Sequence, residues 1–377
     1  MHSNFGNAGA AAIVLLLAFP FAGLVGQTQS KLKLDTGKEI FEAGCVPCHG
    51  ADGRGQAPSL QAFTRPSTFP DFTDCYGTTP EADWQWRAVI SNGGPGRGFS
   101  QIMPSFKDEL TPEQINKVIG YLRTLCADDA KWPRGDLNFP RALITEKAFP
   151  EDETVVTATV NAHGAPGVES AVVYEKRIGS RGQLEAMVPY NYTHEGSAWQ
   201  SGFGDVLIGY KHNMYSNIKT GTIFSLLGEV TAPTGDTTKG TGGGSTVFET
   251  SAAFGQMLPA DGFVQLHTGF ELPAHTEVLP RAYYLRTAIG KTFAPDHGLG
   301  RRWSPMVEFV YDRDLVTGAD NNWNIVPEIQ IPVSKRLHIL GNIGYYIPVN
   351  HTADRPKQLM FYLLWDFADG KVTEGWK

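Results

Sequence analysis

The spacing of apolar and polar residues changes near residue 127 of the 377-residue sequence. Before that point, apolar residues recur with helical periodicity, which predicts helices over residues 35–43, 84–90 and 111–125. The third helix has Pro112 at its first position, where proline is favoured because that amide has no partner within the helix. The first third of the chain is therefore predicted to be helical, with loops between the helices.

After residue 153 the period of alternation changes to two, which is typical of strands with one buried face. In the last such segment Leu359, Phe361 and Leu363 share one face, and Asp366 lies on the other. About twelve segments of this kind are separated by turns rich in Gly, Asp, Asn and Pro. We predict strands near residues 154–162, 168–178, 182–192, 203–215, 220–232, 245–258, 261–274, 281–294, 303–316, 322–333, 336–349 and 357–368.

Three architectures share this alternation: a soluble β-sandwich, a soluble barrel and a membrane barrel. Sandwich strands are usually about five or six residues long, and a soluble barrel of the lipocalin type needs only about eight strands. Long strands in an even number, with Tyr and Trp near their ends, are typical of an outer-membrane barrel. We therefore predict that residues 154–368 form an antiparallel transmembrane β-barrel of about 12 strands.

The two faces of the predicted strands differ in charge. If the more apolar face meets lipid, charged residues are expected on the interior face, because a charge facing lipid costs roughly 2–4 kcal/mol at the midplane. The residues assigned to the interior include more acidic than basic side chains. Such a lining is expected of a water-filled lumen, and the alternative is a lumen that selects cations. The residues assigned to the interior are Glu185, Asp205, Lys211, Glu229, Arg286, Glu308, Asp312, Glu328 and Asp366.

The remaining segments are predicted from composition. An apolar run over residues 10–21, followed by small residues, predicts an export signal over residues 1–26, although residues 1–9 contain no Lys or Arg. Residues 128–153 are predicted to be a linker, because they combine prolines with mixed charges. Residues 369–377 follow the last predicted strand as a tail.

One motif carries chemistry in the helical part: Cys45 and Cys48 are followed directly by His49. In a C-x-x-C-H motif the two thiols add to the vinyl groups of haem, and the histidine coordinates the iron. The same spacing also occurs as half of a zinc site, but no second Cys/His pair with suitable spacing follows. We therefore predict one covalently attached haem c.

The second axial ligand is predicted by elimination. Between the export signal and the linker, Met103 is the only methionine and His49 the only histidine. A thioether ligand favours ferrous iron, as in electron-transfer cytochromes; the alternative is a structural methionine beside an open iron site. The barrel histidines, His338 among them, show no ligand spacing and are predicted not to bind metal.

The two other cysteines, Cys75 and Cys126, also lie in the helical part. Haem attachment of this kind takes place outside the bacterial cytoplasm, where disulfides persist. The pair is therefore expected either to form a disulfide or to remain as two buried thiols, depending on a Cα separation that the sequence does not give.

Residues 33–127 resemble the class I cytochromes c. Gly37 and Phe41 lie where these domains place a glycine and an aromatic residue in the first helix, and Tyr121 matches the aromatic residue of the last helix. The loop with Met103 matches the loop of the distal ligand. The resemblance implies an all-α cytochrome c domain with His49 and Met103 as axial ligands.

The same resemblance implies a role for Pro58, which lies in the glycine-rich run after the haem motif. Its carbonyl would accept a hydrogen bond from His49 and fix the orientation of the ring. Five further residues could contact the haem propionates. The arginines are expected instead to be solvated and the tryptophans to lie in the core; the residues are Arg54, Arg65, Arg97, Trp84 and Trp86.

The barrel part resembles a second group, the outer-membrane proteins named for the meta-pathway of phenol degradation. Residues 202–211 and 231–236 look like two motifs of that group, whose members are taken to be barrels and transporters of small organic molecules. A departure is the tail after Phe367, because many outer-membrane barrels end in an aromatic residue. In plan, the chain is similar to fused cytochrome–porins, which are associated with extracellular electron transfer.

Together these features predict a c-type cytochrome anchored at the bacterial outer membrane, with its haem domain on the periplasmic side. It would transfer electrons between periplasmic carriers and an extracellular donor or acceptor reached through the barrel. The alternatives are a solute pore with an attached redox domain and a barrel that only anchors a periplasmic cytochrome. No catalytic triad or acid–base pair is recognisable, which favours an electron-transfer protein over an enzyme. The net charge of -7 argues against a nucleic-acid partner.

Overall fold

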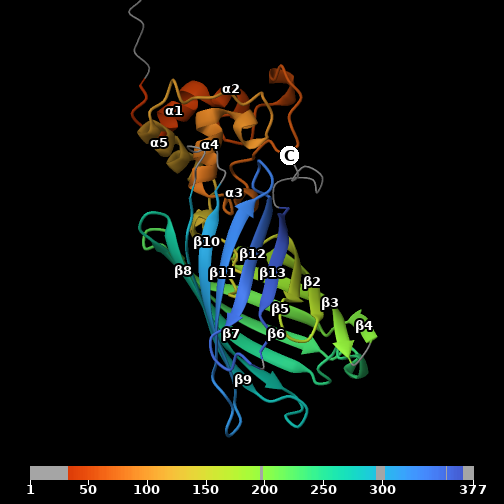
Figure 1. The fold of residues 1–377 in the computed structure, drawn as a ribbon. Coiled ribbons are helices and arrows are strands. Elements are labelled where there is room, and N and C mark those ends of the chain that lie inside the picture. The colour runs from red at the N-terminus through yellow and green to blue at the C-terminus, as the bar shows by residue number, and fades with distance from the viewer. Residues whose placement is uncertain (1–32, 196–197, 294–301, 354, 368–377) are drawn as a thin grey trace, which may run out of the picture. The chain divides into compact units, whose positions relative to one another are not determined.

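The computed structural model describes residues 33–195, 198–293, 302–353 and 355–367. The described residues from Leu34 onward belong to one compact unit, drawn in Figure 1. The predicted export signal and the predicted tail lie outside the described residues. No helix in the described ranges is long and apolar enough to span a bilayer.

The residues before the barrel contain helices and, within the described ranges, no strand (Figure 1). Three of the helices lie where the apolar spacing predicts them. Residues 50–74 and 98–111, however, are mostly irregular. The prediction of an all-α domain therefore holds only for the regular elements of this part. The helices are α1 (Gly37–Gly44), α2 (Val46–His49), α3 (Cys75–Thr78), α4 (Asp83–Asn92) and α5 (Pro112–Arg123).

Helices α1 and α5 form the centre of this part. Ile40 and Phe41 of α1 are buried against Val118 and Leu122 of α5. The helices cross so closely at Gly37 that a Cβ atom there would lie 2.0 Å from the carbonyl oxygen of Lys117. A glycine is therefore required at this crossing, and the crossing fixes where α1 delivers the haem motif.

A disulfide joins Cys75, the first residue of α3, to Cys126, which follows α5. The two Cα atoms are 5.2 Å apart, within the ordinary range for a disulfide. Of the two states that the sequence allows for this pair, the structure has the bridge. It connects the ends of a long loop, and the haem motif lies outside that loop.

Twelve strand positions form a closed antiparallel barrel within the described residues. Strands β2 and β3 pair with each other and thereby close the ring. Strands β4 and β5 pair with different halves of β3, so that these two strands together occupy one of the twelve positions around the ring. The strands are β1 (Glu153–Asn161), β2 (Gly167–Ile178), β3 (Gly182–Glu195), β4 (Ala198–Phe203), β5 (Val206–Asn217), β6 (Thr222–Ala232), β7 (Val247–Leu258), β8 (Gly262–Pro273), β9 (Ala282–Lys291), β10 (Ser304–Asp314), β11 (Asn322–Pro332), β12 (Ile339–Pro348) and β13 (Gln358–Asp366).

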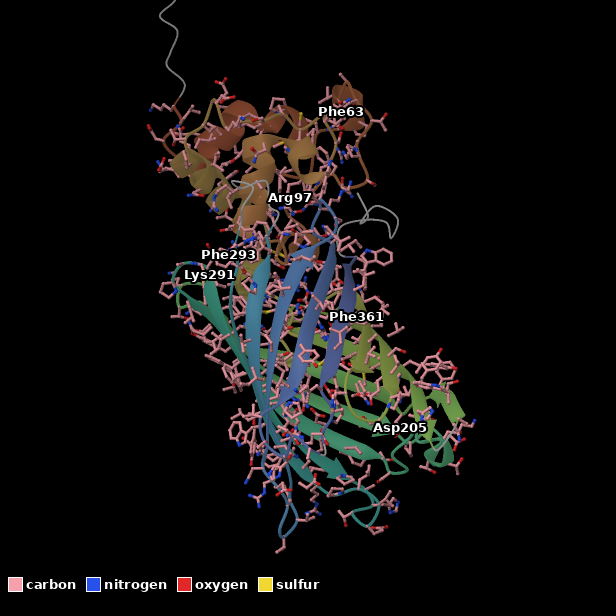
Figure 2. All side chains as sticks on the ribbon, in the orientation of Figure 1. Phe63, Arg97, Asp205, Lys291, Phe293 and Phe361 are labelled. Atoms are coloured by element: carbon pink, nitrogen blue, oxygen red, sulfur yellow. A yellow bond between two sulfur atoms is a disulfide. The ribbon has the colours of Figure 1, made fainter. Side chains whose placement is uncertain are left out.

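The outer face of the barrel is apolar, as the alternation predicts. Phe361, labelled in Figure 2, is 42% exposed, whereas Glu308 and Lys211 are buried in the interior at 0% and 2% exposure. Each strand position contributes at least one exposed large apolar side chain; one from each is Val156, Val172, Leu184, Ile208, Leu226, Phe248, Phe270, Ile289, Phe309, Ile331, Ile343 and Phe361.

Asp205 has a different role from the interior one that the alternation predicts. It lies in the break between β4 and β5, where its carboxyl oxygens accept hydrogen bonds from the amides of Gly235 and Gly243 at 2.8 and 2.7 Å. The Thr234 hydroxyl donates to the Gly204 carbonyl at 3.0 Å. The two segments with recognisable motifs in the barrel therefore form one hydrogen-bonded unit that holds a long loop.

The segment predicted to be a linker runs inside the barrel. We call residues 137–151 the inner segment. Its apolar residues Leu137, Phe139 and Phe149 pack in one buried cluster with Ile223 and Phe263 of the wall. The rings of Phe139 and Phe263 stack with their centroids 5.8 Å apart. The connection between the two parts of the chain is therefore also part of the barrel core.

Polar contacts hold the inner segment on the remaining sides. Arg141 pairs with Glu153 and Glu175 at 2.7 and 2.9 Å. The carboxyl group of Glu308 accepts hydrogen bonds from the amides of Ile144 and Thr145. Ten strands supply a hydrogen-bonding side chain to this segment: Glu153, Glu175, Gln183, Lys211, Ser225, Gln265, Glu308, Glu328, Asn342 and Tyr362.

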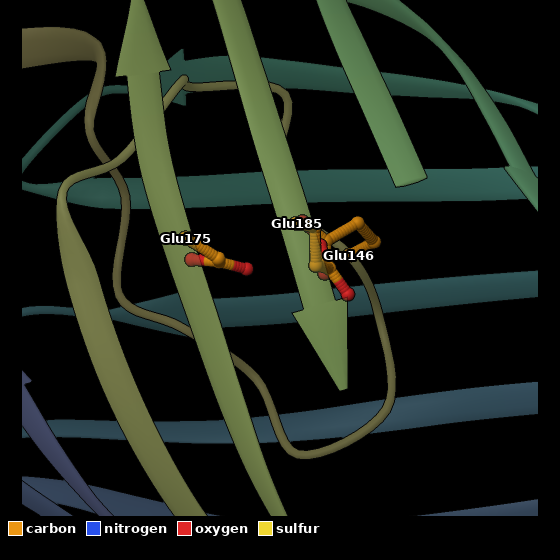
Figure 3. Close-up of side chains that lie close together, drawn as sticks. All are labelled: Glu146, Glu175 and Glu185. Atoms are coloured by element: carbon orange, nitrogen blue, oxygen red, sulfur yellow. The ribbon is translucent and has the colours of Figure 1, made fainter. Parts of the chain in front are cut away.

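Three glutamates of this interior lie close together (Figure 3). Glu146 of the inner segment, Glu175 and Glu185 have carboxyl oxygens within 4.8 Å of one another. Arg141 pairs with Glu175, and Lys211 pairs with Glu146. These cations pair with two of the three carboxyl groups, so that the cluster takes part in the packing of the inner segment against the wall.

Removing the disulfide tests how much the Cys75–Cys126 bridge contributes to the haem domain. We expect a Cys75→Ser/Cys126→Ser variant to lose about 2 to 4 kcal/mol of unfolding free energy, because the bridge closes a long loop in the unfolded chain. The measurement is urea unfolding followed by haem absorbance. An unfolding midpoint equal to that of the unaltered protein would contradict this role.

Candidate haem site

The end of α1 and the short helix α2 place the haem motif. Cys45 caps α1, its amide donating to the Phe41 carbonyl at 2.9 Å, and the His49 amide donates to the Cys45 carbonyl at 2.9 Å. Cys48 and His49 therefore lie one helical turn beyond Cys45. Both motif cysteines are free thiols in the structure. The local fold thus presents two thiols and an imidazole together.

These residues line a cavity with a volume of about 430 Å³. Its lining includes Cys45, Cys48 and His49, and Met103 from the loop beyond α4. The His49 ring stacks on Phe69 with centroids 4.9 Å apart. The other apolar residues that line the cavity include Phe72, Trp86, Val89, Ile90, Phe99, Ile102, Phe106 and Leu122.

Burial keeps two of the motif side chains, Cys45 and His49, in their uncharged forms. Burial, assisted by the positive charge of Arg65, lowers the pKa of His49 to about 4. Burial, followed by the effect of Cys48, raises the pKa of the Cys45 thiol to about 11. A neutral imidazole is the form that coordinates a metal, and the largely apolar lining of the cavity suits the face of a porphyrin.

The predicted contact between His49 and Pro58 is not present in the structure. The carbonyl of Pro58 accepts a hydrogen bond from the amide of Gln61 at 3.3 Å. The buried Nδ1 atom of His49 has no hydrogen-bond partner among the described residues. The role of Pro58 in orienting the ring remains a prediction.

One residue of the barrel also lines this cavity, although the search for the second axial ligand covered only the residues between the export signal and the linker. His338 precedes β12 in sequence, is 4% exposed and lines the 430 Å³ cavity. A smaller adjoining cavity is lined by Cys45, His49 and Met103 but not by His338. Because Met103 shares both cavities with His49, the geometry favours Met103 over His338 as the second axial ligand. No local sequence signal connects His338 to this site.

The expectation of a solvated Arg97 is wrong. Arg97 is 2% exposed and lines the cavity, and it lies between the helical part and the barrel in Figure 2. Its guanidinium carbon lies 5.3 Å from the ring centroid of Trp84, and that of Arg302 lies 4.4 Å from the same ring. Trp86 lines the cavity, whereas Arg54, Arg65 and Trp84 do not.

These observations define a class of site. Two free thiols separated by two residues, an adjacent neutral imidazole and an apolar cavity are what covalent attachment of haem c requires. The orphaned Nδ1 atom of His49 belongs to a ring held between aromatic side chains. The residues present therefore fit a haem c group, with Cys45 and Cys48 as the covalent attachments and His49 as an iron ligand.

Comparison with known families agrees with this class. Residues 34–126 match the model of the Cytochrome c family. This part of the chain is a cytochrome c domain, which implies covalent haem c, and a closed twelve-stranded barrel follows it.

Two solved structures are similar to the barrel part. One is the KdgM porin in complex with disordered oligogalacturonate, with 10% identity, a TM-score of 0.39, and coverage of 57% of this chain and 99% of that chain. Another is an outer membrane channel from Pseudomonas putida F1, with 13% identity, a TM-score of 0.42, and coverage of 61% and 99%. At such scores the similarity carries no argument, and the description of the barrel depends on its own strand pairing.

Replacing the two candidate ligands separately identifies the sixth ligand. We expect Met103→Ala to abolish the charge-transfer band of methionine-ligated ferric haem and to open the ferrous iron to carbon monoxide, because the thioether is lost. His338→Ala, the matched variant in the same cavity, is expected to keep the band. Absorption spectroscopy of the purified proteins is the measurement, and loss of an axial ligand only in His338→Ala would assign the ligand to the barrel.

Proposed function

We propose that this protein is an outer-membrane-anchored c-type cytochrome that exchanges electrons with periplasmic carriers. The haem supplies one-electron oxidation and reduction of its iron. Cys45, Cys48 and His49 would hold the group, Met103 is the proposed second ligand, and the apolar lining of the cavity would shield the group from water. The observation that carries the proposal is the inner segment, which makes the barrel a filled support for the haem domain.

The apolar outer face supports a membrane location. An exposed apolar side chain on every strand position forms a belt around the barrel. Large apolar surfaces of this kind mark contact with lipid or protein. Among the described residues every strand except β4, which pairs with β3 alone, is paired on both sides, and such pairing is what a lipid environment requires. Lipid of the outer membrane is therefore the proposed surrounding of this belt.

The lengths of the connections support the orientation. At the end where β1 begins, most turns are short, at residues 179–181, 218–221, 259–261 and 333–338, with residues 292–303 as the exception. The opposite end has longer loops, including residues 233–246 and 349–357. Outer-membrane barrels have short periplasmic turns and longer extracellular loops. We therefore place the cytochrome domain, which precedes β1, on the periplasmic side.

The inner segment favours an anchor over a solute pore or a route to the outside. It contacts side chains from ten strands, so that a solute would have to displace it in order to pass. A single haem is also far shorter than the apolar band of about 25 Å and does not bridge it alone. The partners that the geometry supports best are soluble periplasmic electron carriers.

Intact cells test this function. A reductant coupled to a polymer too large for porins is expected to leave the haem oxidised in intact cells and to reduce it after lysis, because the haem lies on the periplasmic side. The measurement is the haem absorbance of cells that contain the protein. Cells that contain a Cys45→Ala/Cys48→Ala variant provide the baseline. Reduction in intact cells would instead establish exchange with an extracellular donor.

A further inference from the structure

We propose that the barrel positions the distal haem ligand, through a contact between Arg336 and the loop that carries Met103. We call residues 93–103 the distal loop. This inference rests on the proposed haem site with Met103 as ligand. It adds to that site a residue of the barrel, Arg336, which lies outside the cytochrome domain. Arg336 is a positioning residue, because it acts through the loop and not on the iron.

The contact between Arg336 and the distal loop is direct. The Nε and Nη2 atoms of Arg336 both donate to the carbonyl oxygen of Gly98, each at 3.1 Å. In return, Nη2 of Arg97 donates to the carbonyl oxygen of Arg336 at 3.0 Å. Arg336 is 4% exposed. The turn between β11 and β12 and the distal loop are therefore joined by three hydrogen bonds, of which the one from Arg97 is buried and the two from Arg336 are partly buried.

The side chain of Arg336 also packs on the distal loop. Its guanidinium carbon lies 4.8 Å from the ring centroid of Phe99. Phe99 lines the haem cavity, as does His338, two residues beyond Arg336. The planar guanidinium combines a fork of donors with a face that stacks on an aromatic ring, and lysine does not reproduce this combination.

Within the distal loop, the contact is transmitted to Met103 by short backbone links. The Phe99 amide donates to the Gly94 carbonyl at 2.9 Å, and the Gly94 amide donates to the Met103 carbonyl at 3.0 Å. A Cβ atom on Gly94 would lie 2.1 Å from the carbonyl oxygen of Ser100. The loop is therefore folded tightly on itself, so that a restraint at Gly98 restrains the backbone of Met103.

This arrangement couples the distal ligand to the barrel. When Arg336 holds Gly98, the Met103 backbone stays in place. The loop then loses less conformational entropy when the sulfur of Met103 coordinates the iron. Without Arg336 the loop gains freedom, and the thioether competes less well with an external ligand for the iron. The predicted consequence is a weaker sixth ligand in a haem that remains covalently attached.

Imidazole competition in the purified full chain measures this coupling. We expect Arg336→Ala to bind imidazole at the ferric haem about tenfold more tightly, because charge-assisted hydrogen bonds to the loop are lost. The charge-transfer band of methionine-ligated haem should weaken in parallel. Arg336→Lys, which keeps one charged donor, should give intermediate values. Lys335→Ala, on the same turn but exposed, should match the unaltered protein.

The outcomes separate this inference from the function on which it rests. If the unaltered protein shows the band and Arg336→Ala retains both the band and the original imidazole affinity, the positioning role is wrong and the haem site stands. If the unaltered protein lacks the band, ligation by Met103 is wrong, and this inference falls with it. Heat-dependent electrophoretic mobility reports whether the barrel of each variant is folded. If Arg336→Ala does not fold, an imidazole affinity of Arg336→Lys equal to that of the unaltered protein overturns the inference.

Discussion

The arrangement of this protein depends on the hydrogen bonds by which two glutamates of the barrel wall hold the inner segment. Glu308 accepts from the amides of Ile144 and Thr145, and Glu328 accepts from the amide of Leu143 at 3.0 Å. Backbone amides buried away from water must find partners, and so must buried carboxyl groups. Both carboxyl oxygens of Glu308 and one of Glu328 find partners in this way, and three successive amides are thereby fixed in the middle of the barrel.

This constraint reaches the haem domain because the inner segment is continuous with it. The amide of Gly135, just before the inner segment, donates to the carbonyl of Thr79 at 2.8 Å. Asp152, just after it, accepts hydrogen bonds from Tyr76 of α3 and from Lys176 of β2. Residues at both ends of the inner segment therefore contact the cytochrome domain, and Arg336, in the turn between β11 and β12, adds a third connection.

Much of this could be predicted from the sequence, because the patterns involved are local. The period of two located the strands, and the spacing of Cys45, Cys48 and His49 indicated haem attachment without any tertiary information. For Phe361 and Glu308, alternation alone was enough to indicate which face meets the interior. The cytochrome domain was recognisable for the same reason, since its motif residues follow one another along one short segment.

The inner segment and the Arg336 contact could not be predicted, because both depend on residues that are distant in sequence. Leu143 and Glu328 are 185 positions apart, and Arg336 and Gly98 are 238 positions apart. Prolines and mixed charges near Pro140 are typical of an exposed linker, and the same composition serves equally well to pair with the charged lining of a barrel. Arg97 resembled a solvated arginine, since its hydrogen bond to the barrel joins residues that are 239 positions apart.

Electrical conductance across a planar lipid bilayer tests most directly whether the inner segment blocks the lumen of the barrel. We expect the purified full chain to insert without stable open channels. We expect a Glu308→Ala/Glu328→Ala variant to conduct, because it loses the side chains that hold the backbone from Leu143 to Thr145. Stable open channels in the unaltered protein, of the same conductance as in the variant, would show that the inner segment does not block the lumen.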